Sequence, residues 1–139
     1  MVIYNHIIES KRKGEKLFSI LVDPDKQTKG GLLRIVEKAK SSNVDLFFVG
    51  GSLLTNNSLD FCVTIIKQNC KIPVLLFPGN AMQVNNKADG ILFLSLISGR
   101  NAEMLIGNHV ITAPFLKESG IEVLPTGYML IDSGKATTV

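Results

Sequence analysis

The chain has 139 residues, 45% of them hydrophobic and 19% charged, so it is long and apolar enough to bury the core of a single globular domain. A formal net charge of +3, with basic residues spread along the chain apart from a short run at residues 11–13, argues against nucleic acid as a partner. No apolar run approaches the roughly 20 residues that span a bilayer, and the N-terminus lacks the basic-then-apolar pattern of a signal peptide, so we expect a cytoplasmic protein.

The chain opens with a helical pattern, because Ile3, Ile7 and Ile8 recur at helical spacing and a glycine follows. A nearly continuous apolar run at residues 17–22 comes next and stops at Asp23. Such a short run is typical of a strand that is buried on both faces of a parallel sheet.

The same order of elements then recurs. An apolar stripe at residues 32–39 predicts a second helix, and residues 45–49 predict a second strand. Helical spacing returns at residues 59–66, ahead of a third strand at 72–77. A short polar stretch leads from there to a fourth strand at 90–95.

The last third of the chain contains one helix and two further apolar elements. We expect Asn101 to cap a helix that extends through Val110, and Pro114 to kink or restart it. Residues 121–124 and 128–131 are the last two elements.

Strands that alternate with helices in this way predict right-handed βαβ units and a parallel sheet. Two α/β architectures share the pattern: an open five-stranded sheet of the flavodoxin type, with a binding or signalling role, and a closed (β/α)8 TIM barrel. Periodicity does not separate them. Because a barrel takes about 250 residues, it would use residues 1–139 as one N-terminal portion with roughly five of its eight units.

Polar and glycine residues gather where the predicted strands end. The carboxyl ends of parallel strands point at the ligand in both architectures. Turn formation or helix capping explains each group singly, but four in a row favour a site. The groups are residues 23–26, Gly50 with Gly51 and Ser52, residues 78–80, and Ser95.

Asp23 and Ser52 are the candidate metal ligands. Pro24 holds Asp23 in an extended conformation, which projects its carboxylate beyond the strand end. Ser52 occupies the equivalent place on the neighbouring predicted strand, so two hard oxygen ligands face one space. Such ligands suit Mg²⁺, which keeps several waters and bridges to substrate phosphates.

Other chemistries have weaker support. Gly50 and Gly51 allow close approach of a ligand but match neither G-x-G-x-x-G nor the Walker A pattern. His6 and His109 have no partners at catalytic or metal-ligand spacing, so we interpret His109 as a surface or core histidine.

Two alternatives concern cysteine and lysine chemistry. Cys62 and Cys70 lack further ligands at zinc spacing and predict buried free thiols rather than a metal site or a disulfide. Lys26 and Asp25 keep open a phosphate-binding barrel isomerase or aldolase, which needs a lysine or paired carboxylates at strand ends.

Five strings, in order, are similar to one family of enzymes. Together they make the likeness specific, and it extends over residues 17–139. The sequence resembles geranylgeranylglyceryl phosphate synthase and its bacterial relative that makes heptaprenylglyceryl phosphate. The strings are LVDPDK (21–26), FVGGS (48–52), LLFPGN (75–80), LFLSLISGRN (92–101) and LPTGYMLI (124–131).

The resemblance implies a (β/α)8 barrel that transfers a polyprenyl group from its diphosphate to the C3 hydroxyl of sn-glycerol 1-phosphate, in ether phospholipid biosynthesis. It assigns Mg²⁺ as cofactor, held by Asp23 and Ser52, where the metal would neutralise the departing pyrophosphate. It also implies a homo-oligomer that makes peripheral contact with the membrane to release its lipid product.

Substrate contacts are expected from residues inside the matching strings. Gly50 and Gly51 are candidates for close approach to the substrate, and Phe77 and Tyr128 for contact with it. A prenyl chain needs a long apolar groove, although core packing alone also explains apolar strand residues. The candidates to line the groove are Phe77, Leu92, Phe93, Leu94 and Leu96.

Two departures from the family pattern matter. Leu21 stands two positions before Asp23, where some members have a phosphate-contacting lysine. The family's glycerol-phosphate loops and the glutamate near the acceptor hydroxyl belong to later strands, beyond Val139. The general base is therefore not assigned, and the 139 residues alone are expected to be inactive.

Overall fold

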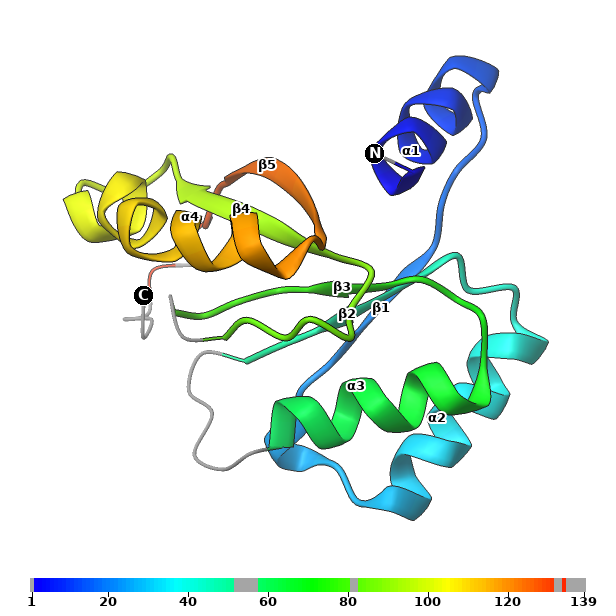
Figure 1. Cartoon of the computed structure of the whole chain (residues 1–139). Coiled ribbons are helices and arrows are strands. Elements are labelled where there is room, and N and C mark those ends of the chain that lie inside the picture. The colour runs from blue at the N-terminus through cyan, green and yellow to red at the C-terminus, as the bar shows by residue number, and fades with distance from the viewer. Residues whose placement is uncertain (1, 52–57, 81–82, 132–133, 135–139) are drawn as a thin grey trace.

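The structure is a computed structural model, and it describes residues 2–51, 58–80, 83–131 and 134 (Figure 1). Five strands alternate with helices along the chain, except that no helix lies between β3 and β4 among the described residues. The elements are α1 (Val2–Lys13), β1 (Ser19–Val22), the 3-10 turn η1 (Pro24–Lys26), α2 (Lys29–Ser41), β2 (Leu46–Val49), α3 (Ser58–Asn69), β3 (Val74–Leu76), β4 (Gly90–Leu96), the π-helical turn η2 (Glu103–Gly107), α4 (Asn108–Ser119) and β5 (Glu122–Tyr128).

All five strands are parallel and follow one another in sequence order, β1-β2-β3-β4-β5. A flavodoxin-like sheet would instead have the order 2-1-3-4-5, because its chain reverses direction after the first two strands. Sequential order is what successive strands of a barrel adopt. The open-sheet alternative is therefore wrong, and the barrel architecture is the one that fits.

Side chains alternate between the two faces of this sheet. One residue from each strand forms a continuous row on the face that α2 and α3 cover, and these residues belong to the larger core cluster. From β1 to β5 the row is Val22, Val49, Leu76, Ile91 and Val123. Figure 1 shows α2 and α3 against this face of β1 to β3.

The opposite, inner face carries a second and smaller core cluster. Ile3 of α1 is buried there against Leu46, Leu75, Leu92 and Leu124. Figure 1 shows α1 on the side of the sheet away from α2 and α3. The opening helix thus covers the inner face, while the later helices cover the outer one.

Glu122, the first residue of β5, holds α1 in place. Its carboxylate accepts hydrogen bonds from the backbone N–H groups of Val2, Ile3 and Tyr4 at 2.7, 2.9 and 2.9 Å. Partial burial alone would raise the pKa of Glu122, but these hydrogen bonds outweigh it and hold the pKa below its ordinary value. A charged carboxylate at a helix N-terminus also complements the helix dipole.

Two predictions for the last third need correction. Of the two outcomes expected at Pro114, the restart is wrong, because α4 continues through this residue to Ser119. The missing N–H would have paired with the carbonyl of Val110, an exposed residue that water can reach. Residues 121–124 and 128–131 are not separate elements, because β5 continues through Pro125. As β5 pairs only with β4 among the described strands, a proline without an N–H is tolerated on its free edge.

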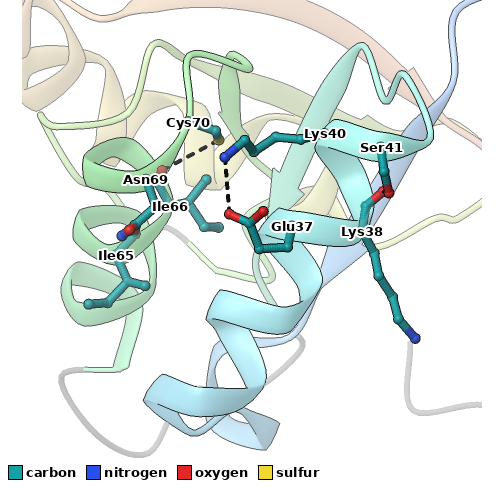
Figure 2. A network of polar contacts seen from close by, with 8 residues as sticks. All are labelled: Glu37, Lys38, Lys40, Ser41, Ile65, Ile66, Asn69 and Cys70. Carbon is teal, nitrogen blue, oxygen red and sulfur yellow. Dashed lines mark hydrogen bonds and ion pairs between the residues drawn. The ribbon is translucent and has the colours of Figure 1, made fainter.

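The ends of α2 and α3 are closed by local contacts within each helix (Figure 2). Ser41 Oγ donates to the carbonyl of Lys38 at 2.9 Å, and Asn69 Nδ2 donates to that of Ile65 at 2.8 Å. The Cys70 thiol donates to a carbonyl one turn back at 3.4 Å. Within the described ranges, no helix is long and apolar enough to cross a membrane.

Candidate functional site

A cavity of about 320 Å³ lies at the carboxyl ends of the strands. Its wall includes Leu21 of β1, the glycine pair that follows β2, the turn that follows β3, and Tyr128 of β5. Helical residues that precede and begin α4 complete it. In this class of fold the loops at the carboxyl ends form the ligand site.

All four predicted substrate contacts line this cavity. They are Gly50, Gly51, Phe77 and Tyr128. Of the predicted groove residues, Phe93, Leu94 and Leu96 also line it. Leu92 does not line it, and is buried in the cluster around Ile3.

Gly50 is required by the close approach of β2 and β3. A Cβ atom at this position would lie 1.9 Å from the carbonyl oxygen of Phe77 and 2.7 Å from its carbonyl carbon. The two strand ends are joined by a hydrogen bond from Phe77 N to Val49 O at 2.9 Å. The glycine is therefore needed for the neighbouring backbone, whether or not a ligand also approaches it.

Aromatic rings line up across the inner face near the cavity. The ring of Phe77 lies 6.0 Å from that of Phe48 and 5.7 Å from that of Tyr128, which meets it edge-on at 89°. Edge-to-face pairs are a favoured geometry and fix the orientation of both rings. Phe77 is thus held between β2 and β5.

The helical wall of the cavity was not predicted. Met104, Asn108 and Thr112 line it at spacings of four residues, a pattern that places them on one helix face. Met104 belongs to the π-helical turn η2, and such turns are frequent at functional sites. The predicted cap is confirmed, since Asn101 Oδ1 accepts from the backbone N–H of Glu103 at 3.0 Å.

His109 also lines the cavity. Its Nε2 lies 2.7 Å from the carbonyl oxygen of Leu94, and because a carbonyl only accepts, this nitrogen donates the hydrogen bond. The ring centroid is 4.1 Å from that of Phe93. His109 therefore joins the helical wall to β4, a role that its isolated position in the sequence gave no reason to expect.

Asp23 lies directly beyond β1, two residues after the cavity residue Leu21, and keeps an extended backbone (φ −84°, ψ 112°). One carboxylate oxygen accepts from Asp25 N at 3.2 Å, and the other lies 2.8 Å from Lys26 Nζ. The hydrogen bond to Asp23 and its charge raise the pKa of Lys26. Asp23 itself is not among the residues that line the cavity.

At the carboxyl ends of the strands, Asp23 is the described candidate ligand, and its oxygen atoms fit a magnesium ion. Mg²⁺ binds through one or two carboxylates together with waters and substrate phosphates, so the Asp23 carboxylate suits it once the exposed Lys26 moves aside. The second predicted ligand, Ser52, lies outside the described residues. No cluster of three or more His, Cys, Asp or Glu side chains that could hold a metal occurs in the part of the chain that the structure describes.

Sequential parallel strands, with a cavity and glycine turns at their carboxyl ends, define a protein of the (β/α)-barrel class, and the cavity lies where such barrels bind their ligands. The sequence matches the PcrB family over residues 6–139, and the chain belongs to this family.

Similar proteins from a bacterium and an archaeon carry the same name. The chain is 52% identical over 137 residues to geranylgeranylglyceryl phosphate synthase of Chitinophaga pinensis, a match that covers 99% of this chain and 54% of that protein. The protein of the same name from Methanosphaera stadtmanae is 38% identical over 134 residues, 96% of this chain and 55% of that protein. The chain spans about half the length of the curated relatives it matches.

Solved structures of proteins with this name also match most of this chain and about half of their own length. (S)-3-O-geranylgeranylglyceryl phosphate synthase from Thermoplasma acidophilum, in complex with the substrate sn-glycerol-1-phosphate, matches with a TM-score of 0.86 at 30% identity, over 93% of this chain and 52% of that one. Wild-type GGGPS from Thermoplasma volcanium matches with a TM-score of 0.79 at 32% identity, over 86% of this chain and 48% of that one. These neighbours are TIM barrels, so the chain has the fold of part of such a barrel.

Proposed function

We propose that these residues form the donor-binding part of a prenyltransferase, which joins a polyprenyl diphosphate to the C3 hydroxyl of sn-glycerol 1-phosphate in ether lipid synthesis. The observation that carries the proposal is the cavity at the carboxyl ends of the strands, because it combines an apolar wall with glycine turns next to Asp23. The names of the relatives in the PcrB family support the same reaction.

The apolar part of the cavity suits the prenyl chain. Phe93, Leu94 and Leu96 line it from β4, and Met104 lines it from the helical side. Each buried methylene group contributes about 0.8 kcal/mol, so a polyprenyl chain derives substantial binding energy from such a wall. Length selection would depend on how far this wall extends.

The polar part of the site suits the diphosphate. In the proposal, Asp23 and Ser52 hold Mg²⁺, which when bound supplies positive charge to the departing diphosphate. Gly50 and Gly51 present backbone without side chains at the cavity, which lets the donor come close. Leu21, in the place of a lysine found in some family members, extends the apolar wall instead of contacting a phosphate.

We infer that the remaining strands of the barrel come from elsewhere in the assembled protein. Among the described strands, β1 and β5 each have a neighbour on one side only. Phe18, just before β1, is 55% exposed, which leaves apolar surface at the β1 edge of the sheet. We propose that a further segment or a second copy covers it and supplies the glycerol-phosphate loops.

An aldolase of the Schiff-base type is less well supported. Such a lysine needs a lowered pKa so that its amine is free to attack a carbonyl. The pKa of Lys26 is instead raised, first by its hydrogen bond to Asp23 and then by the charge of that carboxylate. Lys26 therefore remains protonated at neutral pH.

A transfer assay on the full-length protein tests the proposal. It is incubated with Mg²⁺, labelled sn-glycerol 1-phosphate and either geranylgeranyl or heptaprenyl diphosphate, and the lipid phase is then extracted. We expect label in lipid from the 1-phosphate and none from the 3-phosphate enantiomer, and no transfer by residues 1–139 alone. Absence of label from the full-length protein with every prenyl donor would refute the proposed reaction.

A further inference from the structure

Gln83 is the one glutamine side chain among the described residues that is almost completely buried, with 4% of its surface exposed. Its amide makes two hydrogen bonds to backbone. Nε2 donates to the carbonyl oxygen of Gly51 at 2.8 Å, and Oε1 accepts from the N–H of Gly79 at 3.1 Å. A buried amide is costly unless both ends are paired, so these partners fix its position.

The two bonds specify glutamine and its orientation. Gly51 offers an acceptor and Gly79 a donor, so rotating the amide by 180° would lose both bonds. Ionised glutamate at this position would keep the acceptor but lose the donor, and an apolar residue would lose both. A backbone hydrogen bond also holds Gln83 in position, because Gln83 N donates to Asn80 O at 3.3 Å.

The amide connects two walls of the cavity. Gly51 follows β2 and Gly79 follows β3, and both line the cavity, as does Val84, which follows Gln83. Gln83 itself is not among the lining residues and lies behind them. It therefore acts on a ligand only through the backbone that it holds.

We propose that Gln83 is a positioning residue, which fixes the turns after β2 and β3 relative to each other and so sets the shape of the donor-diphosphate end of the cavity. This role rests on the proposed prenyl transfer. Both turns contain glycine, and Gly51 has no side chain that could pack it in place. A side-chain link between them supplies the rigidity that positioning of a substrate requires.

Steady-state kinetics of the full-length protein tests this role, with Gln83→Met as the main variant because methionine has a similar length and no amide. We expect the KM for geranylgeranyl diphosphate to rise about 10-fold or more, with a smaller change in kcat. Gln83→Glu, which retains the acceptor for Gly79, should raise the same KM and serves if the methionine variant does not fold. The control is Asp45→Asn at the amino ends of the strands, where Asp45 Oδ2 accepts from Phe18 N at 2.7 Å; the amide keeps an acceptor for this N–H and removes only the charge.

Amide hydrogen exchange provides a readout that does not depend on turnover. In Gln83→Met the Gly79 amide should exchange faster than in the wild type, and in Gln83→Glu it should stay protected. Two results would overturn the role of Gln83 while leaving the proposed function intact, provided that the wild type is active. One is unchanged exchange of the Gly79 amide in Gln83→Met. The other is a KM in both Gln83 variants equal to that of Asp45→Asn. A wild type that transfers no prenyl group would overturn both.

Discussion

Acidic residues at the amino ends of the strands make different contacts from those at the carboxyl ends. At the amino ends of the strands, three carboxylates are engaged with backbone: Asp45 accepts from Phe18 N, Asp89 accepts from Val74 N at 2.8 Å, and Glu122 accepts from three residues of α1. At the carboxyl ends, the Asp23 carboxylate contacts a local turn and an exposed lysine, next to a cavity.

This difference separates structure from chemistry on one sheet. Carboxylates that pair with backbone N–H groups stabilise the fold, because they satisfy donors that would otherwise lose a partner. A carboxylate whose contacts are local and partly exposed can exchange them for a ligand at little cost. Single substitutions on each side test this difference.

Asp23→Asn should abolish most of the activity of the full-length protein. The amide retains an acceptor for Asp25 N but removes the charge that would bind Mg²⁺, so we expect kcat to fall by roughly 100-fold or more and thermal stability to change little. Removal of divalent ions with EDTA should have a similar effect on the wild type. Near-normal turnover of the variant at limiting Mg²⁺ would exclude Asp23 as a ligand.

Gly50→Ala should disturb both the fold and the cavity. The added methyl would lie 1.9 Å from the Phe77 carbonyl, and we expect the free energy of unfolding to fall by about 1–3 kcal/mol in urea denaturation. Gly30→Ala is the matched control, since its Cβ would meet only the end of Arg34 at 3.7 Å. In helix α2 that change should stabilise by about 0.5–1 kcal/mol, and equal effects of the two substitutions would contradict the packing described here.

Asp89→Ala tests the role of a carboxylate at the amino ends of the strands. It removes the acceptor for Val74 N and the ion pair with Lys67 at 2.6 Å, so the free energy of unfolding should fall by about 1–2 kcal/mol. The kcat/KM of the folded protein should stay within about twofold of the wild type. A large loss of kcat/KM with unchanged stability would show that this edge also takes part in the chemistry.

Glu122 makes stability depend on pH. Its pKa is lower in the folded state, so its stabilisation is fully present above the ordinary value of 4.5 and is lost as the pH falls through the lowered folded-state value. Glu122→Gln should reduce the free energy of unfolding by about 1 kcal/mol at pH 7, and this gap should shrink in acid. A gap that stays constant between pH 7 and pH 3 would contradict a charged interaction with α1.

Cys62 reports on the protein interior near Asp23. Burial, and then the charge of Asp23, raises the pKa of this thiol to about 12. In folded protein at pH 8 it should resist alkylation by iodoacetamide, and it should react once urea unfolds the chain. Mass spectrometry after tryptic digestion distinguishes Cys62 from the half-buried Cys70, and rapid alkylation of Cys62 in the native state would contradict the packing of α3.

Much of the fold could be predicted, because short apolar runs and helical stripes determine which elements form. The helices and the first four strands lie close to their expected positions, and Cys62 is buried as predicted. The merger of the last two elements through Pro125 could not be predicted, since proline is tolerated only where the strand edge is free. That depends on neighbours, which periodicity does not describe.

The site was predicted unevenly. Gly50, Gly51, Phe77 and Tyr128 line the cavity, because the strand ends of a parallel sheet lie on one side, and their contact with substrate remains a prediction. Gln83 was missed because an isolated glutamine in a polar stretch carries no pattern, and its role depends on two backbone groups from separate turns. The metal assignment of Asp23 and Ser52 remains a prediction.

The link between Glu122 and α1 also has a consequence for the order in which the chain folds. Each strand pairs with the next one along the chain, so neighbouring units can form as they are synthesised, whereas this link joins positions 118 to 120 residues apart. At ribosomal rates of about 5–20 residues per second, the first helix would wait roughly 6–24 s for its partner. Its final position is therefore reached late, after the sheet that it covers.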